Sequence, residues 1–254
     1  GCSHCRRDNQ PLTKEIQTML DIQKATLKTL KSYVGGLSKP SKMPGWAYGL
    51  PPQECKIGKN LREVEGSVCS GCYAFKGHYT MYKEVKSAQY NRLAAISKPQ
   101  WVPAMVRLIG HYSKEVFRWH DAGDINSLSH LQSIVAIAKA LPETKFWIPT
   151  REAHVVRRWK QGCNDKCEAI CSLTHFKRKV PTNLCVRLSA AMQDIKPPKY
   201  VGLEGLPTST VHTKEHLGKP GESIECGAYK RGGECGACRA CWSPLVSNVS
   251  YRNH

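Results

Sequence analysis

The spacing of apolar positions along the chain changes from a helical period to short apolar runs separated by amphipathic segments. Residues 13–34 carry apolar side chains three and four positions apart, which predicts a helix that ends at the Gly35–Gly36 pair. Helices are also expected over 81–96, 100–110, 128–141 and 152–160, and strands over 115–120, 145–150, 183–189 and 208–212. Apolar strands that alternate with helices are typical of a parallel sheet covered by helices.

Polar side chains directly follow three of these expected strands. Asp121 and Asp124 come after the first strand and Arg151 after the second. Arg187 and Ser189 lie at the end of the third. In parallel α/β folds the functional groups gather beyond the carboxyl ends of the strands, so we expect a site on that face. The alternative is an ordinary strand-to-helix turn in which an Asp side chain caps the helix.

The composition points to thiol chemistry. The 254 residues include 13 cysteines, an odd number that rules out complete internal disulfide pairing. No apolar run reaches the roughly 18 residues of a membrane helix, and the N-terminal segment has no apolar signal-peptide core. We therefore expect a reducing compartment, where thiols serve metals better than disulfides.

The charge is strongly positive, with 38 Lys and Arg against 20 Asp and Glu and a formal net charge of +18. Such a balance attracts phosphate backbones, so weak and non-specific contact with nucleic acid is one expectation. A generally basic surface that resists aggregation is the other. The positive charge is spread along the chain, and no specific nucleic-acid site is readable.

The strongest motif lies near the C-terminus, where Cys226 precedes Cys235, Cys238 and Cys241. The Cys-x2-Cys-x2-Cys run lets one tight loop present three thiolates to three irons of a [4Fe–4S] cluster, and a remote cysteine takes the fourth. Zinc more often binds well-separated Cys-x2-Cys pairs, and it is the alternative metal here.

A second set, Cys55, Cys69 and Cys72, lies just before the region of alternating strands and helices. Three cysteines around a cubane leave one iron open to a substrate or cofactor. The alternative is a zinc site that His78 completes.

Two further groups of potential ligands have no assigned role: Cys163, Cys167, Cys171, His175 and Cys185 in one, and Cys2, His4 and Cys5 in the other. The first group lies largely in an apparent insertion over 162–182, where its thiols can bind metal, fill small buried positions or act in redox chemistry. The second lies at a chain end, where fraying is the expected behaviour.

Six segments follow one another between about Ser38 and Trp242: SKMPGWAYGLPPQECKIG, VCSGCYAFKGHY, FRWHDAGDI, FWIPTR, RLSA and CGACRACW. In this order they resemble the gene product 88 proteins of phages that infect actinobacteria and other hosts. That family resembles radical S-adenosylmethionine (SAM) enzymes in layout, with a three-cysteine loop, a partial barrel and a cysteine-rich tail.

The resemblance implies an α/β fold with a radical-SAM-like partial (β/α) barrel over 38–215. A helical extension over 1–37 would precede it, and a cysteine-rich, cluster-binding tail over 216–254 would follow it. The cluster loop would cover 55–72. The expected location is the host cytoplasm or the virion.

For an enzyme of this kind the resemblance implies a [4Fe–4S] cluster on the loop cysteines that binds SAM. The residues that would hold or orient the ligand are Gly123, Asp124 and Ser189 as cofactor-binding residues, and Asp121, Asp124, Arg151 and Arg187 as catalytic residues. Two other functions stay open. One is a non-catalytic iron–sulfur carrier, sensor or virion component whose cluster is ligated entirely by protein. The other is a zinc-stabilised protein that binds nucleic acid.

Overall fold

The computed structural model of the chain describes residues 12–76, 78–163, 178–213 and 223–253. Its helices are α1 (Leu12–Lys24), α2 (Leu27–Val34), α3 (Lys56–Leu61), α4 (His78–Met81), α5 (Lys83–Ala95), α6 (Trp101–Tyr112), α7 (Leu128–Ala140) and α8 (Ala153–Lys160). Its strands are β1 (Trp46–Tyr48), β2 (Val116–Trp119), β3 (Lys145–Thr150), β4 (Leu184–Ser189), β5 (Thr208–His212), β6 (Ile224–Glu225) and β7 (Asn248–Arg252).

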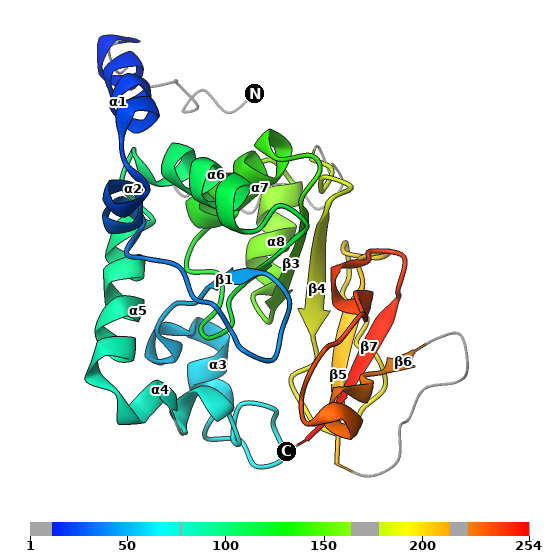
Figure 1. The fold of residues 1–254 in the computed structure, drawn as a ribbon. Coiled ribbons are helices and arrows are strands. Elements are labelled where there is room, and N and C mark those ends of the chain that lie inside the picture. The colour runs from blue at the N-terminus through cyan, green and yellow to red at the C-terminus, as the bar shows by residue number, and fades with distance from the viewer. Residues whose placement is uncertain (1–11, 77, 164–177, 214–222, 254) are drawn as a thin grey trace.

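Within these residues the strands form one sheet in the order β1-β2-β3-β4-β5-β7-β6, and every neighbouring pair is parallel. From β1 to β5 the strands follow chain order, so each connection steps to the next strand along the sheet (Figure 1). The prediction of a parallel α/β fold is confirmed. The sheet is open, with β1 and β6 at its edges in the described part of the chain, and a barrel is not confirmed.

The predicted strands and helices of the central region agree closely with the structure, whereas the N-terminal helix does not. The predicted helix over 13–34 is split into α1 and α2, because Thr26 begins a new helix and its hydroxyl accepts a hydrogen bond from the Thr29 N–H at 3.2 Å. α2 then ends at Gly35, whose φ of 74° is the left-handed conformation that favours glycine. β6 and β7 were not predicted.

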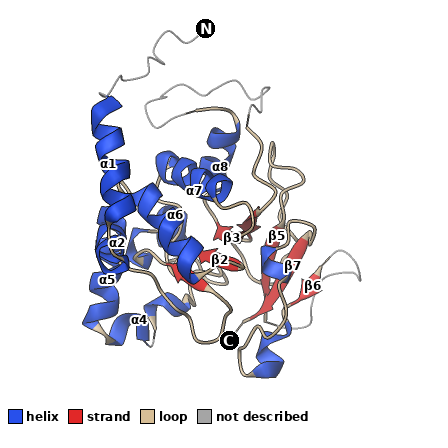
Figure 2. Cartoon of the chain, turned by 45° about the horizontal axis from the view of Figure 1, so that its top comes forward, coloured by secondary structure: helices blue, strands red, loops and turns tan. Residues whose placement is uncertain are grey.

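The two faces of the sheet have different covers. α6, α7 and α8 pack on one face, where Phe117, Phe146 and Val186 join the main apolar core (Figure 2). Because successive strand residues point to opposite faces, Arg118, Trp147 and Arg187 point to the other face. There Trp147 packs with Trp242 of the C-terminal tail.

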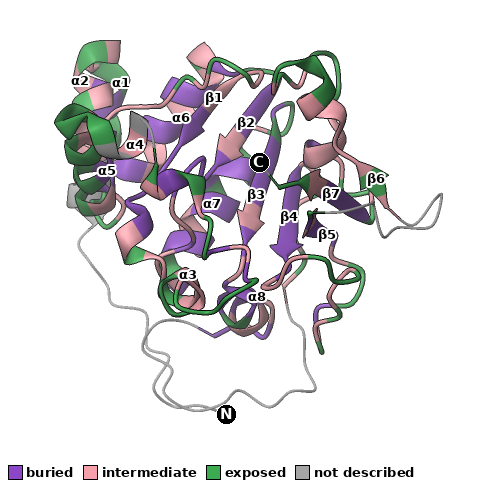
Figure 3. Ribbon diagram, turned by 90° about the horizontal axis from the view of Figure 1, so that it is seen from below, coloured by how far each residue is buried: buried purple, intermediate pink, exposed green. Residues whose placement is uncertain are grey.

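Buried residues concentrate in the central strands and in the helices behind them, while the peripheral helices and loops carry most of the exposed surface (Figure 3). None of the described helices has the length and apolar character that a bilayer crossing requires.

Candidate functional site

The loop set, Cys55, Cys69 and Cys72, converges around Gly58. A Cβ built on Gly58 would lie 3.0 Å from Cys55 Cβ, 3.5 Å from Cys69 Sγ and 3.7 Å from Cys55 Sγ. A side chain at position 58 would therefore occupy the space beside two thiols. Cys72 lies near enough that a thiolate there raises the pKa of both Cys55 and Cys69.

The segment that carries this set lies across the carboxyl ends of three strands. Three hydrogen bonds tie it there: Ile57 N–H to Glu152 Oε1 at 2.9 Å beyond β3, Val68 N–H to Ala191 O at 2.9 Å beyond β4, and Tyr73 O–H to Asp121 O beyond β2. These three contacts place the loop thiols at the edge where parallel α/β folds hold their functional groups.

Burial is the main influence on the acidity of the loop thiols. It raises the pKa of Cys55, and the neighbouring Asp124 carboxylate adds to the rise. Burial also raises the pKa of Cys69, and the Arg151 guanidinium opposes the rise at both thiols. Cys55 and Cys69 are therefore protonated when no metal is bound, and metal binding at these two thiols would release protons.

Asp124 joins the turns that follow β2 and β3. Its Oδ1 accepts hydrogen bonds from Thr150 Oγ1 at 2.6 Å and from the Ile125 N–H at 2.7 Å. Its Oδ2 accepts from the Arg151 N–H at 2.9 Å. Burial raises the pKa of Asp124 to about 6 although these hydrogen bonds lower it. The carboxylate thus fixes the turn that carries Arg151 beside the thiols.

Gly123 allows this turn. Its φ is 80°, and a Cβ on it would lie 2.7 Å from Leu50 O. Both the left-handed conformation and the close approach of the β1 end require glycine at this position.

The other predicted ligand-orienting residues have hydrogen-bond partners of their own. Asp121 is buried, with Oδ2 at 3.4 Å from Tyr79 Oη. Ser189 Oγ contacts Ser209 Oγ at 3.1 Å on the neighbouring strand. Arg187 lies within β4 rather than beyond its end. The predicted roles of these residues toward a ligand stay predictions.

The tail set, Cys226, Cys235, Cys238 and Cys241, lies over the face of the sheet opposite α6–α8. Cys241 Sγ is 3.1 Å from Tyr251 Oη on β7. Burial raises the pKa of Cys235, and it raises that of Cys241 to about 12. At both thiols a negative charge on Cys226 adds to the rise and Arg118 opposes it.

Each set contains the same kind of local turn. The Cys72 N–H donates to Cys69 O at 3.2 Å, and the Cys238 N–H donates to Cys235 O at 3.2 Å. Each Cys-x2-Cys pair therefore brings two thiols together on one tight turn, as cluster-binding and zinc-binding loops require.

Arg187 holds the tail against the sheet. It is fully buried, and its guanidinium donates to four backbone carbonyls: Thr208 O at 2.8 Å, Val246 O at 3.1 Å, Ala240 O at 3.1 Å and Ser243 O at 3.1 Å. Two of these carbonyls flank Cys241 and Trp242. Arg187 thus fixes the loop that carries the last tail thiol.

Within the described residues, no three His, Cys, Asp or Glu side chains meet closely enough to hold one metal ion. Cys163 is packed in the core beneath the helices, whereas Cys185 points to the opposite face, 3.6 Å from Arg187 Nη2. The remaining candidate ligands, Cys2, His4, Cys5, Cys167, Cys171 and His175, lie outside the described residues.

Sequence reasoning missed Glu152, Arg118 and Tyr73. Glu152 follows Arg151 in an expected strand-end turn. An acidic residue at that edge could have been named as a candidate from the sequence. Arg118 lies inside a strand, so finding it needed the assignment of strand faces. Tyr73 follows Cys72 directly, and this neighbouring position was the one feature of the sequence that pointed to it.

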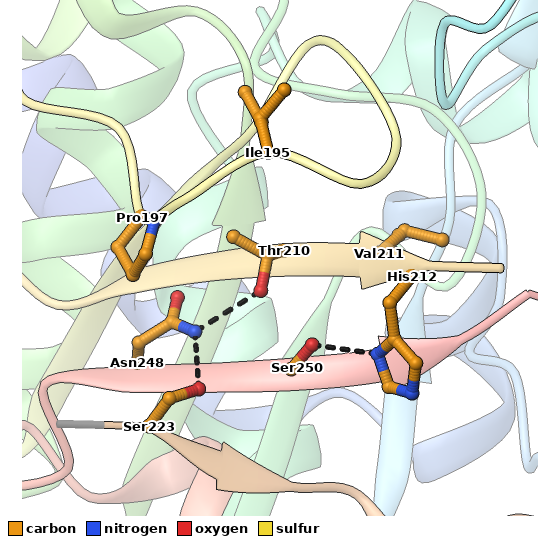
Figure 4. Close-up of a pocket in the computed structure, with 8 residues that line it drawn as sticks. All are labelled: Ile195, Pro197, Thr210, Val211, His212, Ser223, Asn248 and Ser250. Carbon is orange, nitrogen blue, oxygen red and sulfur yellow. Dashed lines mark hydrogen bonds between the residues drawn. The ribbon is translucent and has the colours of Figure 1, made fainter. Parts of the chain in front are cut away.

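A separate polar cluster joins β5, β7 and the start of β6 (Figure 4). His212 Nδ1 contacts Ser250 Oγ at 2.7 Å, and His212 Nε2 contacts Glu225 Oε1 at 3.3 Å. Asn248 Nδ2 donates to Thr210 Oγ1 at 3.1 Å and to Ser223 Oγ at 2.7 Å. The cavity beside these groups has room for about one water molecule. The cluster therefore links strands rather than admitting a substrate.

The gene product 88 family matches residues 10–244 of the chain. Comparison with curated proteins and with solved structures gave no match. The matched region includes both cysteine sets and strands β1 to β6, and β7 follows it. The chain belongs to the gene product 88 family.

Proposed function

We propose that this protein binds iron–sulfur clusters at both cysteine sets. Cys55, Cys69 and Cys72 would hold one [4Fe–4S] cluster, and Cys226, Cys235, Cys238 and Cys241 would hold another. The observation that carries the proposal is that each set gathers in one place, the loop set at the carboxyl edge of the sheet and the tail set on the face opposite α6–α8.

The chemistry of the donors fits such clusters. A cubane places its thiolates on separate irons, so its ligands surround a volume rather than a single point. Gly58 leaves such a space open beside Cys55 and Cys69. Arginines near both sets, Arg151 at the loop and Arg118 at the tail, offset negative charge of the kind that a thiolate-bound cluster carries.

The unequal numbers of thiols favour different roles for the two sites. Four cysteines can close the tail site, whereas three leave one ligand position of the loop site open. A cluster bound there would supply the open iron and the reducing electron for radical SAM chemistry. The consecutive parallel strands with helices on one face also support a partial, radical-SAM-like barrel.

In this proposal the chain's own groups bind and orient SAM. Arg151 places a positive charge at the loop thiols, and Asp124 fixes the turn that carries it. Asp124 also presents a carboxylate close enough to Cys55 to influence its pKa, and a carboxylate is the group suited to an ammonium of SAM.

The test is metal analysis of protein purified without oxygen. Unaltered protein should contain about eight irons, since each [4Fe–4S] cluster holds four, with matching sulfide. The double substitutions Cys69→Ala/Cys72→Ala and Cys235→Ala/Cys238→Ala should each remove about four irons. Cys185→Ala removes a thiol outside both sets and should leave the iron content unchanged.

Stoichiometric zinc without iron would refute the proposal and support the zinc-stabilised alternative. Addition of SAM to the reduced protein should change the paramagnetic signal of the loop cluster, and Asp124→Ala should weaken that change. An unchanged signal together with a full iron content would identify a closed, non-catalytic cluster protein.

A further inference from the structure

Arg118 lies between the two cysteine sets. It is the third residue of β2, on the face opposite α6–α8, and its guanidinium stacks 4.5 Å from the centroid of the Trp147 ring. β2 contributes no cysteine, so neither motif draws attention to this residue.

On the loop side, Arg118 Nη2 donates to Tyr73 Oη at 3.4 Å. Tyr73 follows Cys72 directly, and its hydroxyl in turn donates to Asp121 O. Arg118 therefore contacts the residue that fixes the last loop thiol over the end of β2.

On the tail side, the Trp147 ring under Arg118 packs against Trp242, with centroids 5.2 Å apart. Trp242 follows Cys241 directly, and its Nε1–H donates to Phe117 O at 2.9 Å. Cys241 itself packs on the same apolar cluster. Arg118 also places a positive charge near Cys235 and Cys241.

We propose that Arg118 is a positioning residue shared by the two cysteine sites, through which a change at one site reaches the other. It joins the loop through Tyr73 and the tail through Trp147 and Trp242. The inference rests on the proposed function for its redox readout, and its structural readout is independent of any cluster.

The structural readout is hydrogen exchange of the metal-free full-length protein. Arg118→Gln should speed exchange over 66–76 and over 235–242 together. Arg239→Gln is the matched control, because Arg239 contacts Glu115 Oε1 at 3.1 Å, Gly236 O at 2.7 Å and Cys238 O at 3.1 Å, and none of these lies in the loop. This control should speed exchange over 235–242 alone. A change confined to one segment in Arg118→Gln would overturn the inference.

The redox readout is the midpoint potential of each cluster, followed by electron paramagnetic resonance and assigned with the cysteine double substitutions. Loss of a nearby positive charge disfavours an added electron, so Arg118→Gln should lower the tail potential and also alter the loop signal. Arg118→Lys keeps the charge and should restore the tail potential. Arg239→Gln should leave the loop signal unchanged.

A loop signal that is the same in Arg118→Gln as in unaltered protein would also overturn the inference. Absence of iron from the unaltered protein would instead refute the proposed function, and the exchange experiment would then decide the role of Arg118 alone.

Discussion

At the scale of single residues, Arg151 opposes the effect that burial has on the loop thiols. Burial favours the neutral thiol at Cys55 and Cys69, whereas a cluster or metal needs thiolate. Arg151→Gln should therefore weaken metal binding at the loop, and the loop should lose its iron faster to a chelator. Arg151→Lys keeps the charge and should behave more like unaltered protein, and equal loss in both variants would contradict this account.

Two buried histidines make stability depend on pH. His120 and His130 lie with ring centroids 5.5 Å apart, and burial lowers the pKa of His130 to about 3 and that of His120 well below its ordinary range. The unfolded chain binds protons at these positions below about pH 6.5, whereas the folded chain does not. Stability is thus fully present above that pH and falls as the pH drops toward 3, by up to about 1.4 kcal/mol per pH unit for each group.

The measurement is urea unfolding at pH 7, 5 and 4, compared between unaltered protein and His130→Asn. The pKa of Asp124 is raised to about 6, which acts in the opposite direction, so the difference between the two proteins isolates His130. The variant should show a flatter decline below pH 6.5. An identical decline would exclude His130 as a source.

At the scale of elements, the described tail segment 226–246 consists of turns and short 3-10 helices, and Arg187 of β4 donates to three of its carbonyls. Arg187→Met would leave buried carbonyls of the tail without a donor, and we expect the free energy of unfolding to fall by about 3 kcal/mol. Arg157→Met is the comparison, because Arg157 is bonded at the surface to Val201 O at 2.8 Å. That variant should change stability by no more than about 0.5 kcal/mol. Similar losses in both would argue against a special role for Arg187.

The sequence predicted the elements whose pattern is local. The strands at 145–150 and 208–212 have the predicted bounds, because apolar runs between turns carry a clear signal. β7 was missed because it lacks an apolar run. Its polar residues Asn248 and Ser250 are buried and form hydrogen bonds with β5. The tail's position on the sheet depends on contacts such as Trp242 with Phe117, which no local pattern encodes.

The candidate site, like the fold, could be predicted only where the pattern is local in the sequence. Spacing alone marked the two cysteine sets as candidates, because a cluster-binding loop presents its thiols on tight turns. The residues that connect the sets were not predictable, since Arg118 and Glu152 act through partners far away in the sequence.

At the scale of the whole molecule, the net charge of +18 supports the proposal that the surface attracts nucleic acid. A groove between α2 and α5 is lined by Lys83 and Lys98, with Glu84 as an acidic neighbour. We predict weak binding of DNA or RNA that falls with salt. If the groove contacts phosphates, Lys83→Gln/Lys98→Gln should reduce the salt slope by about 1.8, at roughly 0.9 per phosphate contact.

Lys139→Gln/Lys145→Gln makes the same change in charge away from this groove. An equal reduction in that variant would mean diffuse binding over the whole basic surface. Absence of any binding at low salt would refute the expectation of a nucleic-acid partner.

The hydrogen bonds from the loop to Asp121, Glu152 and Ala191 also govern when the site can form. During synthesis the three loop cysteines leave the ribosome early, while the last of their anchors follows only after β4. Until then these thiols lie on a segment without its anchoring hydrogen bonds, where they can be oxidised or can bind an unintended metal ion. If the loop binds a cluster as proposed, the nascent chain has to stay reduced, and the cluster can be inserted at its anchored site only after β4 has been made.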